Sequence, residues 1–142
     1  MGLWVMRTYD VYLIEPVYEF LSKDIDDPLS FEDWMSNPQN IVLTNEHGDI
    51  ALFEIGFKNV YTGHYYFKSR GRQAITAARD FLDELFNTCY NINVLLGLTP
   101  THLRHASWLS RQVGFKSYGF EELNGKQYEV FIITKREFNR NG

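Results

Sequence analysis

Hydrophobic and polar residues alternate along several short stretches of the chain, a pattern that predicts β-strands. The expected strands cover residues 3–8, 40–44, 50–57, 60–67, 91–98, 117–122 and 127–135. The stretch 91–98 is almost wholly apolar, as expected of a strand buried on both faces. Asn45 and Gly48 favour a turn after the second strand, and Asn124-Gly125 predicts a tight hairpin between the last two.

Helical spacing is clearest over residues 74–86, where apolar side chains recur every three or four positions. Ser30, followed three residues later by Asp33, resembles a capping box and predicts a short helix there. Another helix is expected over 101–114, ended by a glycine, and one starting at or near Pro16.

This order of elements predicts a mixed α/β (α+β) fold around a central sheet. Helices that connect strands favour parallel pairing across the two later helices, while the hairpins give antiparallel pairs. The chain has 142 residues and no linker rich in proline, glycine or serine. Residues 1–142 are therefore expected to form a single domain with one substantial core.

The composition of the chain indicates the cellular compartment in which we expect the protein. Cys89 is the only cysteine, so no intrachain disulfide forms, and a structural thiol is the favoured interpretation because no basic residue is nearby. No stretch approaches the roughly 18 apolar residues of a membrane span. The first residues lack the basic leader and apolar run of a signal peptide. We therefore expect a cytoplasmic protein with no membrane partner.

The charges are clustered rather than spread, within a formal net charge of −4. Three basic residues, Lys68, Arg70 and Arg72, fall in one turn, which suits a compact anionic ligand better than a nucleic acid. Acidic residues gather between residues 24 and 33. They are either a solvated loop and helix start or an entrance that favours a cationic substrate.

The basic turn leads directly into the predicted helix 74–86. A helix N-terminus leaves backbone N–H groups unpaired and carries about half a positive charge, so it can bind phosphate. Gly71 has no Cβ and permits close approach of such a ligand. The alternative is a capped helix preceded by a solvated basic turn.

The chain resembles the GNAT N-acetyltransferase superfamily over nearly its whole length, and the resemblance is best over residues 39–134. In that family a loop of pattern Q/R-x-x-G-x-G/A opens the central helix. Gly71 matches the first glycine, Lys68 stands in place of Gln or Arg, and Gln73 occupies the second small position, with Ala74 one place later.

A second motif of the family, NxxAxxxYxxxGF, ends the later helix. Ala106 and the pair Gly114-Phe115 match it, whereas Leu103 and Ser110 replace its asparagine and tyrosine. A closing hairpin follows, as in the family. The aromatic strand ahead of the loop is also similar to small GNAT-like proteins of bacteriophages, which would place the chain in the host cytoplasm.

The resemblance implies a mostly antiparallel central sheet flanked by helices, and acetyl-CoA (coenzyme A) as cofactor. The implied cofactor-binding residues are Tyr65, Tyr66, Phe67, Lys68, Ser69, Arg70, Gly71, Arg72, Gln73, Ala74, Leu103 and Ala106.

Acetyl transfer to an amine needs a base for the amine and an acid for the leaving thiolate. His64 and Glu54 are the candidate bases, although a histidine on an aromatic strand is more often a packed residue. Ser110, at the tyrosine position, is the candidate acid. Tyr65, Tyr66, Tyr118 or water are the alternatives to it.

Two functions follow from the resemblance. The first is an acetyl-CoA-dependent N-acetyltransferase that acts by direct attack of an unidentified acceptor, either a small-molecule amine or a protein N-terminus or lysine. The second is a catalytically degenerate GNAT-fold protein with a binding or phage assembly role. A homodimer is left open. His102 and His105 lack a third ligand, so no metal is expected.

Overall fold

The computed structural model describes residues 4–23, 25–88 and 90–141. Its elements are β1 (Val5–Arg7), α1 (Val11–Ser22), α2 (Phe31–Ser36), β2 (Ile41–Asn45), β3 (Ile50–Ile55), the 3₁₀ turn η1 (Phe57–Asn59), β4 (Tyr61–Tyr66), α3 (Gly71–Asn87), β5 (Val94–Pro100), α4 (Arg104–Val113), β6 (Lys116–Leu123), β7 (Lys126–Thr134) and α5 (Lys135–Asn141). The expected order of strands and helices is confirmed. The prediction for Cys89 and the acidic residue Asp24 lie outside the described residues.

One mixed sheet of seven strands forms the centre of the molecule, in the order β1-β2-β3-β4-β5-β7-β6. Its pairs are antiparallel except β4 with β5, which are parallel and connected by α3. The mostly antiparallel sheet is therefore confirmed. The expected parallel pairing across α4 is wrong, because β7 folds back from β6 and takes the place beside β5.

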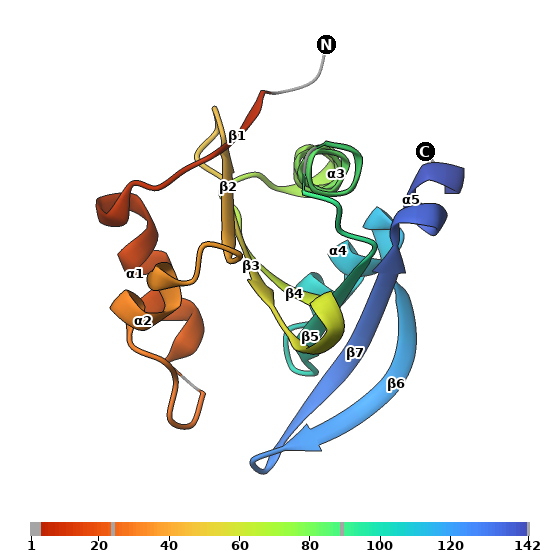
Figure 1. The fold of residues 1–142 in the computed structure, drawn as a ribbon. Coiled ribbons are helices and arrows are strands. Elements are labelled where there is room, and N and C mark those ends of the chain that lie inside the picture. The colour runs from red at the N-terminus through yellow and green to blue at the C-terminus, as the bar shows by residue number, and fades with distance from the viewer. Residues whose placement is uncertain (1–3, 24, 89, 142) are drawn as a thin grey trace.

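Helices cover both faces of this sheet (Figure 1). The helices α1 and α2 pack on one face around Ile14, Trp34 and Leu52. The other face carries α3, α4 and α5, with Phe53 and Phe81 in the core between them. Successive residues of a strand point to opposite faces, so β3 contributes Leu52 to one core and Phe53 to the other.

Three helices begin elsewhere than the sequence suggested, and one of them is α3, which begins at Gly71 and not at Ala74. α1 begins at Val11, because the Asp10 carboxylate accepts a hydrogen bond of 3.0 Å from the Tyr12 N–H. Pro16 lies inside it on an exposed side, where water can reach the carbonyl that loses its partner. α4 begins at Arg104 because β5 extends to Pro100 and a turn follows.

Several local signals are confirmed. Ser30 caps α2 by accepting the Asp33 N–H at 3.1 Å. Gly114 ends α4 with a φ of 118°. The turn between β6 and β7 has positive φ at Asn124 and Gly125, of 53° and 78°. α5 was not predicted. In the described part of the chain no helix has the length and hydropathy that a bilayer span requires.

Candidate functional site

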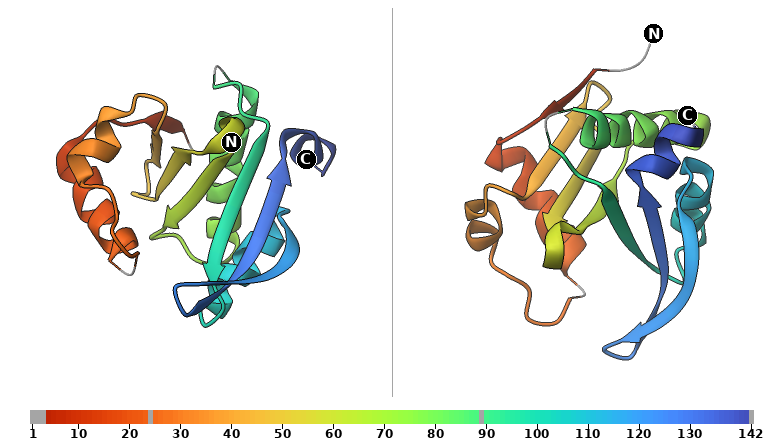
Figure 2. Two further views of the ribbon diagram at one scale, coloured as in Figure 1. Left: turned by 60° about the horizontal axis from the view of Figure 1, so that its bottom comes forward. Right: turned by 45° about the vertical axis from the view of Figure 1, so that its right-hand side comes forward.

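β4 is paired with β3 along its whole length but with β5 only at its beginning. The parallel pairs are Tyr61 with Leu95 and Thr62 with Leu96. From Gly63 onward β4 leaves β5, which continues beside β7 as far as Pro100 (Figure 2). Within the described sheet, the facing edges of the two strands beyond this point have no ladder partner. Their backbone groups are available to a ligand.

A buried carboxylate shapes the turn between β4 and α3. Asp49 is wholly buried, and its Oδ1 accepts the N–H groups of Lys68 and Ser69 at 2.7 and 2.8 Å. Its Oδ2 accepts the Ser69 hydroxyl at 2.6 Å and the Asn45 side-chain amide at 3.1 Å. Burial raises the pKa of Asp49, but these hydrogen bonds outweigh burial and the pKa is lowered. Sequence reasoning missed Asp49, because its partners in this turn, Lys68 and Ser69, lie 19 and 20 positions away.

The first residues of α3 remain open. No side chain caps the helix at Arg70, so the N–H groups of Gly71, Arg72 and Gln73 have no intrahelical or side-chain partner, and the first intrahelical bond runs from the Ala74 N–H to the Arg70 carbonyl at 3.4 Å. Gly71 has a φ of 58°, and a Cβ there would meet no atom within 4 Å. The Arg72 and Gln73 side chains are exposed. An anion can therefore approach this helix end without a steric barrier.

Two of the basic side chains are partly engaged with the turn itself. The Arg70 guanidinium donates to the carbonyls of Phe67 and Ser69 at 2.7 and 3.0 Å. Lys68 extends over Gly48 in the β2–β3 turn. Among the described residues no ion pair is recorded for Lys68, Arg70 or Arg72, so their positive charges are not neutralised by a carboxylate.

The aromatic residues that end β4 divide between the two faces. The Tyr65 and Phe67 rings lie 5.2 Å apart on the α3 side, and Phe67 packs on Phe81. The Tyr65 hydroxyl is buried without a hydrogen-bond partner, and burial raises the pKa of this phenol. Tyr66 lies on the opposite side, against Phe20 of α1.

His64 and Glu54 form a hydrogen-bonded pair on the α1–α2 side of the sheet. His64 Nε2 lies 2.8 Å from Glu54 Oε1. Leu52 is opposite His64 in the β3–β4 ladder, so Glu54 is its diagonal neighbour, a separation that long side chains can bridge. The hydrogen bond from His64 lowers the pKa of Glu54; burial opposes it, while the His64 charge and a Trp34 hydrogen bond add to it.

This pairing fixes the proton on the histidine. An ionised carboxylate only accepts hydrogen bonds, so the shared hydrogen belongs to His64 Nε2. A neutral imidazole then keeps its lone pair on Nδ1, which can accept a proton from a bound molecule. Glu54 also stabilises the imidazolium that would form, as the carboxylate does in other acid–histidine pairs.

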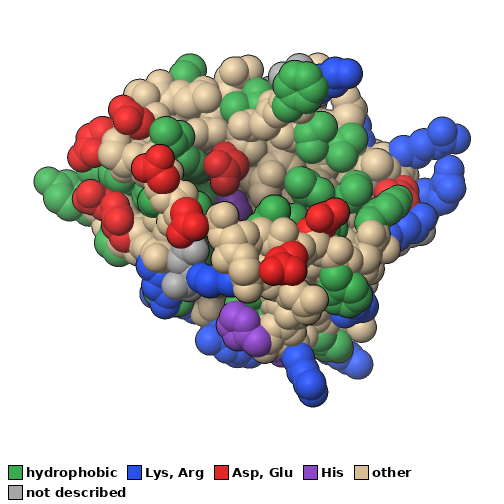
Figure 3. Space-filling model, turned by 90° about the horizontal axis from the view of Figure 1, so that it is seen from below, with side chains coloured by type: hydrophobic (Ala, Val, Ile, Leu, Met, Phe, Trp, Pro, Cys, Tyr) green, Lys and Arg blue, Asp and Glu red, His purple; other side chains and the backbone are tan. Residues whose placement is uncertain are grey.

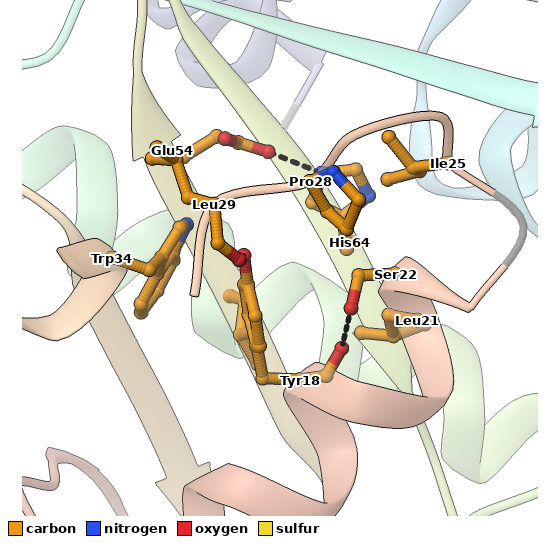
Figure 4. A pocket seen from close by; sticks show the side chains of 10 residues that line it. Tyr18, Leu21, Ser22, Ile25, Pro28, Leu29, Trp34, Glu54 and His64 are labelled. Atoms are coloured by element: carbon orange, nitrogen blue, oxygen red, sulfur yellow. Dashed lines mark hydrogen bonds and ion pairs between the residues drawn. The ribbon is translucent and has the colours of Figure 1, made fainter. Parts of the chain in front are cut away.

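The pair lines a pocket between the sheet and the first two helices (Figure 4). The pocket has a volume of about 110 Å³. Its lining residues are Tyr18, Leu21, Ser22, Ile25, Pro28, Leu29, Trp34, Leu52, Glu54 and His64. Apart from the pair, sequence reasoning missed these residues as pocket residues. Their apolar character is indistinguishable from that of core positions until the fold places them.

The α4 residues lie on the other side of the sheet. Ser110 is buried, on the helix that packs against α3, and is not among the residues lining the pocket of His64. Leu103 and Ala106 stand at the start of α4, which follows the end of β5. Because β4 and β5 are parallel, α3 and α4 begin at the same edge of the sheet.

The histidines of α4 lie outside both sites. His102 and His105 are exposed, and the His105 ring stacks on Trp108 at 5.2 Å. Among the described residues no group of three or more histidine, cysteine or carboxylate side chains is placed to hold a metal ion.

Comparison with known proteins identifies the fold. No protein-family model and no curated protein sequence matches the chain. Solved structures do match. A mutant of the spermidine N-acetyltransferase SpeG from Vibrio cholerae has a TM-score of 0.71 at 15% identity, covering 99% of this chain and 100% of that one. YncA from Salmonella typhimurium, solved with its cofactor acetyl-CoA, has a TM-score of 0.68 at 14% identity, covering 95% of both chains.

A GNAT-family acetyltransferase from Bacillus anthracis gives the same result, with a TM-score of 0.64 at 14% identity and coverage of 96% and 97%. The shared architecture is that of an acetyltransferase fold. More particularly, the chain has the GNAT fold, as the resemblance in its sequence implied.

Proposed function

We propose that the protein is an acetyl-CoA-dependent N-acetyltransferase that transfers an acetyl group to an amine by direct attack. One observation carries the proposal. β4 leads at its end into the open N-terminus of α3, and the same strand presents His64 to the pocket on its other side. β4 separates from β5 between the N-terminus of α3 and the pocket of His64. It is therefore suited to bring a thioester and an amine together.

The residues present fit coenzyme A. The free N–H groups at the start of α3, the space above Gly71 and the charges of Lys68 and Arg72 would hold its pyrophosphate. The Ser69 amide and hydroxyl already donate to Asp49, so they are not free to bind the pyrophosphate. Ser69 would instead fix the shape of the turn together with Asp49. The diverging edges of β4 and β5, between Tyr65 and Ala106, would hold the pantetheine arm.

Bound acetyl-CoA would supply an activated acetyl thioester. Unpaired N–H groups of β4 beyond Thr62 would polarise its carbonyl. As the new C–N bond forms and the C–S bond breaks, His64 Nδ1 would take the proton that the amine loses. Ser110 is the proposed proton donor to the thiolate, and the buried, unpartnered Tyr65 hydroxyl is the second candidate.

Substitution of Gly71 by arginine tests the proposal. The Gly71→Arg side chain would fill the space above the helix end, so it should abolish coenzyme A binding, measured by calorimetry, and thiol release from acetyl-CoA. Gly125→Arg is the matched control, because Gly125 also has positive φ and open space but lies in the β6–β7 turn. Wild type with ligand at 100 Kd should gain about 2.7 kcal/mol of stability, a rise in Tm of about 5–10 °C.

Either of two results would contradict the proposed function. Coenzyme A that binds Gly71→Arg as tightly as it binds Gly125→Arg would show that the cofactor lies elsewhere. Failure of wild type to bind millimolar coenzyme A would leave the second candidate, a GNAT-fold binding or phage assembly protein. One observation favours that candidate: Asp49 already occupies two amides of the turn.

A further inference from the structure

The pocket beside His64 also limits the kind of amine that it can take. We infer that the acceptor is a small primary amine with one positive charge on an apolar chain or ring, and not a polyamine. The inference rests on the proposed function, and it concerns the acceptor side only.

The walls of the pocket are almost entirely apolar. They come from α1 (Leu21), the connection to α2 (Ile25, Pro28 and Leu29), α2 itself (Trp34) and β3 (Leu52). Figure 4 shows the labelled side chains, all of these except Leu52, arranged around one space that Glu54 and His64 also face. An alkyl or aromatic group would replace water against such walls with a favourable free energy.

The hydroxyl groups in the wall are already paired within the protein. Tyr18 donates its hydroxyl hydrogen to the Leu29 carbonyl at 2.6 Å, and Ser22 donates to the Tyr18 carbonyl at 2.7 Å. The first bond also ties the α1–α2 connection to α1 and so fixes the shape of the pocket. Because these hydroxyl groups are already paired, the polar side chains that can bind a ligand are Glu54 and His64.

Glu54 is the one carboxylate among the described residues that line the pocket, and they include no lysine or arginine. Its lowered pKa keeps it negative at neutral pH, and a carboxylate that accepts bonds from His64 and Trp34 still has lone pairs for an ammonium. One charged end therefore matches one ammonium. A second ammonium would lie against aliphatic side chains, where burial of an unpaired charge is unfavourable.

The volume also favours a small ligand. At about 110 Å³ the pocket is smaller than the apolar cavity of about 150 Å³ that admits a benzene molecule. It has room for a short alkyl chain or part of one ring.

Exposed acidic residues alternate along the chain with residues of the pocket wall, without lining the pocket themselves. Asp26, Asp27, Glu32 and Asp33 are exposed and absent from the pocket wall. Figure 3 shows acidic side chains gathered on the face seen from below. Their field raises the local concentration of any cation, so it favours amines in general. The apolar lining and the small volume of the pocket would select among these amines.

Pentylamine and 1,5-diaminopentane form a matched pair of probes, because they differ by one terminal ammonium. With acetyl-CoA and wild-type protein, kcat/KM for pentylamine should exceed that for the diamine, and for spermidine, by about tenfold or more, since the walls offer a second charge no partner. Equal or better use of the diamine or spermidine would overturn the inference and leave the proposed function standing.

Ile25→Asp tests the wall directly. Ile25 is 49% exposed, so the substitution should spare the fold while placing a second carboxylate in the pocket wall. The preference for pentylamine over the diamine should shrink or reverse. Val11→Asp is the matched control, since Val11 is 44% exposed on α1 and does not line the pocket. A preference that changes equally in both variants would contradict a role for the wall.

Calorimetry separates this inference from the proposed function. If no amine is acetylated, the two amines are titrated into the protein without cofactor. Tighter binding of pentylamine than of the diamine, weakened in Glu54→Gln, would support the inference although acetyl transfer had failed. Absence of pentylamine binding would overturn it.

Discussion

Asp49 connects two turns that are distant in the sequence. Through Asn45 it holds the β2–β3 turn, where the Asn45 Oδ1 accepts the N–H groups of His47 and Asp49 itself at 3.0 and 3.1 Å. Through Lys68 and Ser69 it holds the start of α3. A single buried carboxylate thus sets the position of the proposed phosphate site, although no feature of the turn's own sequence indicates it.

Asp49→Asn should weaken this arrangement. The Asn side-chain amide would face the donors of Ser69 or Asn45, and unsatisfied buried hydrogen-bonding groups cost about 1–3 kcal/mol. We expect the free energy of unfolding in urea to fall by that amount and coenzyme A affinity to fall with it. Asp26→Asn, at an exposed carboxylate, is the control. Equal stability of the two variants would contradict the role of Asp49.

Stability should also depend on pH through Asp49 and Glu54. Both pKa values are lowered in the folded protein from their ordinary values of 3.8 and 4.5. In the acid range the unfolded chain therefore binds more protons, so the stabilisation is complete above about pH 5 and is lost as pH falls through the folded pKa values. Urea unfolding at a series of pH values should show this, with a shallower decline in Asp49→Asn. An unchanged slope in that variant would exclude Asp49 as the cause.

At the scale of elements, signals carried by neighbouring residues were predictable. The turns at Gly48 and at Asn124-Gly125, the Ser30 cap and the amphipathic stretch of α3 all depend on local chemistry. The helix start expected at or near Pro16 was wrong, because the Asp10 carboxylate caps α1 and the helix begins at Val11. The place of β7 between β5 and β6 depends on long-range pairing, which no short segment encodes.

Gly63 stands where β4 leaves β5, and its lack of a side chain matters there. A Cβ would lie 3.2 Å from two ring atoms of Phe53, which is fully buried, and 3.3 Å from Leu95. Gly63→Ala should therefore overpack the core and lower the free energy of unfolding by about 1–3 kcal/mol.

Gly97→Ala on β5 is the matched control, since its Cβ would meet Phe131 at an ordinary 3.7 Å. Its stability should change by less than about 0.5 kcal/mol or rise slightly, because alanine restricts the unfolded chain. Chemical denaturation of both variants decides the point. If Gly63→Ala is as stable as Gly97→Ala, the Phe53 ring moves aside at little cost and the predicted overpacking is wrong.

At the scale of the whole molecule, one sheet separates two cores. Sequence reasoning found His64 and Glu54 as candidate residues but could not place them on the α1–α2 side, nor separate them from Ser110 on the other. That separation follows from the alternation of strand residues combined with the packing of distant helices, so it requires the assembled fold.

The single-domain prediction leads to a test of cooperativity. Trp34 is 3% exposed in the α1–α2 core, whereas Trp4 and Trp108 are 49% and 40% exposed, so fluorescence reports mainly on Trp34. Far-ultraviolet circular dichroism reports on the helices of both faces. Urea transitions followed by the two methods should coincide. An earlier fluorescence transition, retained when Trp4 and Trp108 are replaced by phenylalanine, would divide the chain into separately unfolding parts.

The brief parallel contact of β4 and β5 has a consequence for the order of folding. The hairpins β2–β3, β3–β4 and β6–β7 join neighbouring segments, whereas β4 and β5 are separated by residues 67–93, which include α3, and meet at two residue pairs. Loop closure must precede such a contact, and it gains only two residue pairs, fewer than any other described pairing of the sheet, so we expect β4 and β5 to join last. The gap in which a thioester would lie is then the final part of the molecule to form, and a ligand bound across it would slow the first step of unfolding.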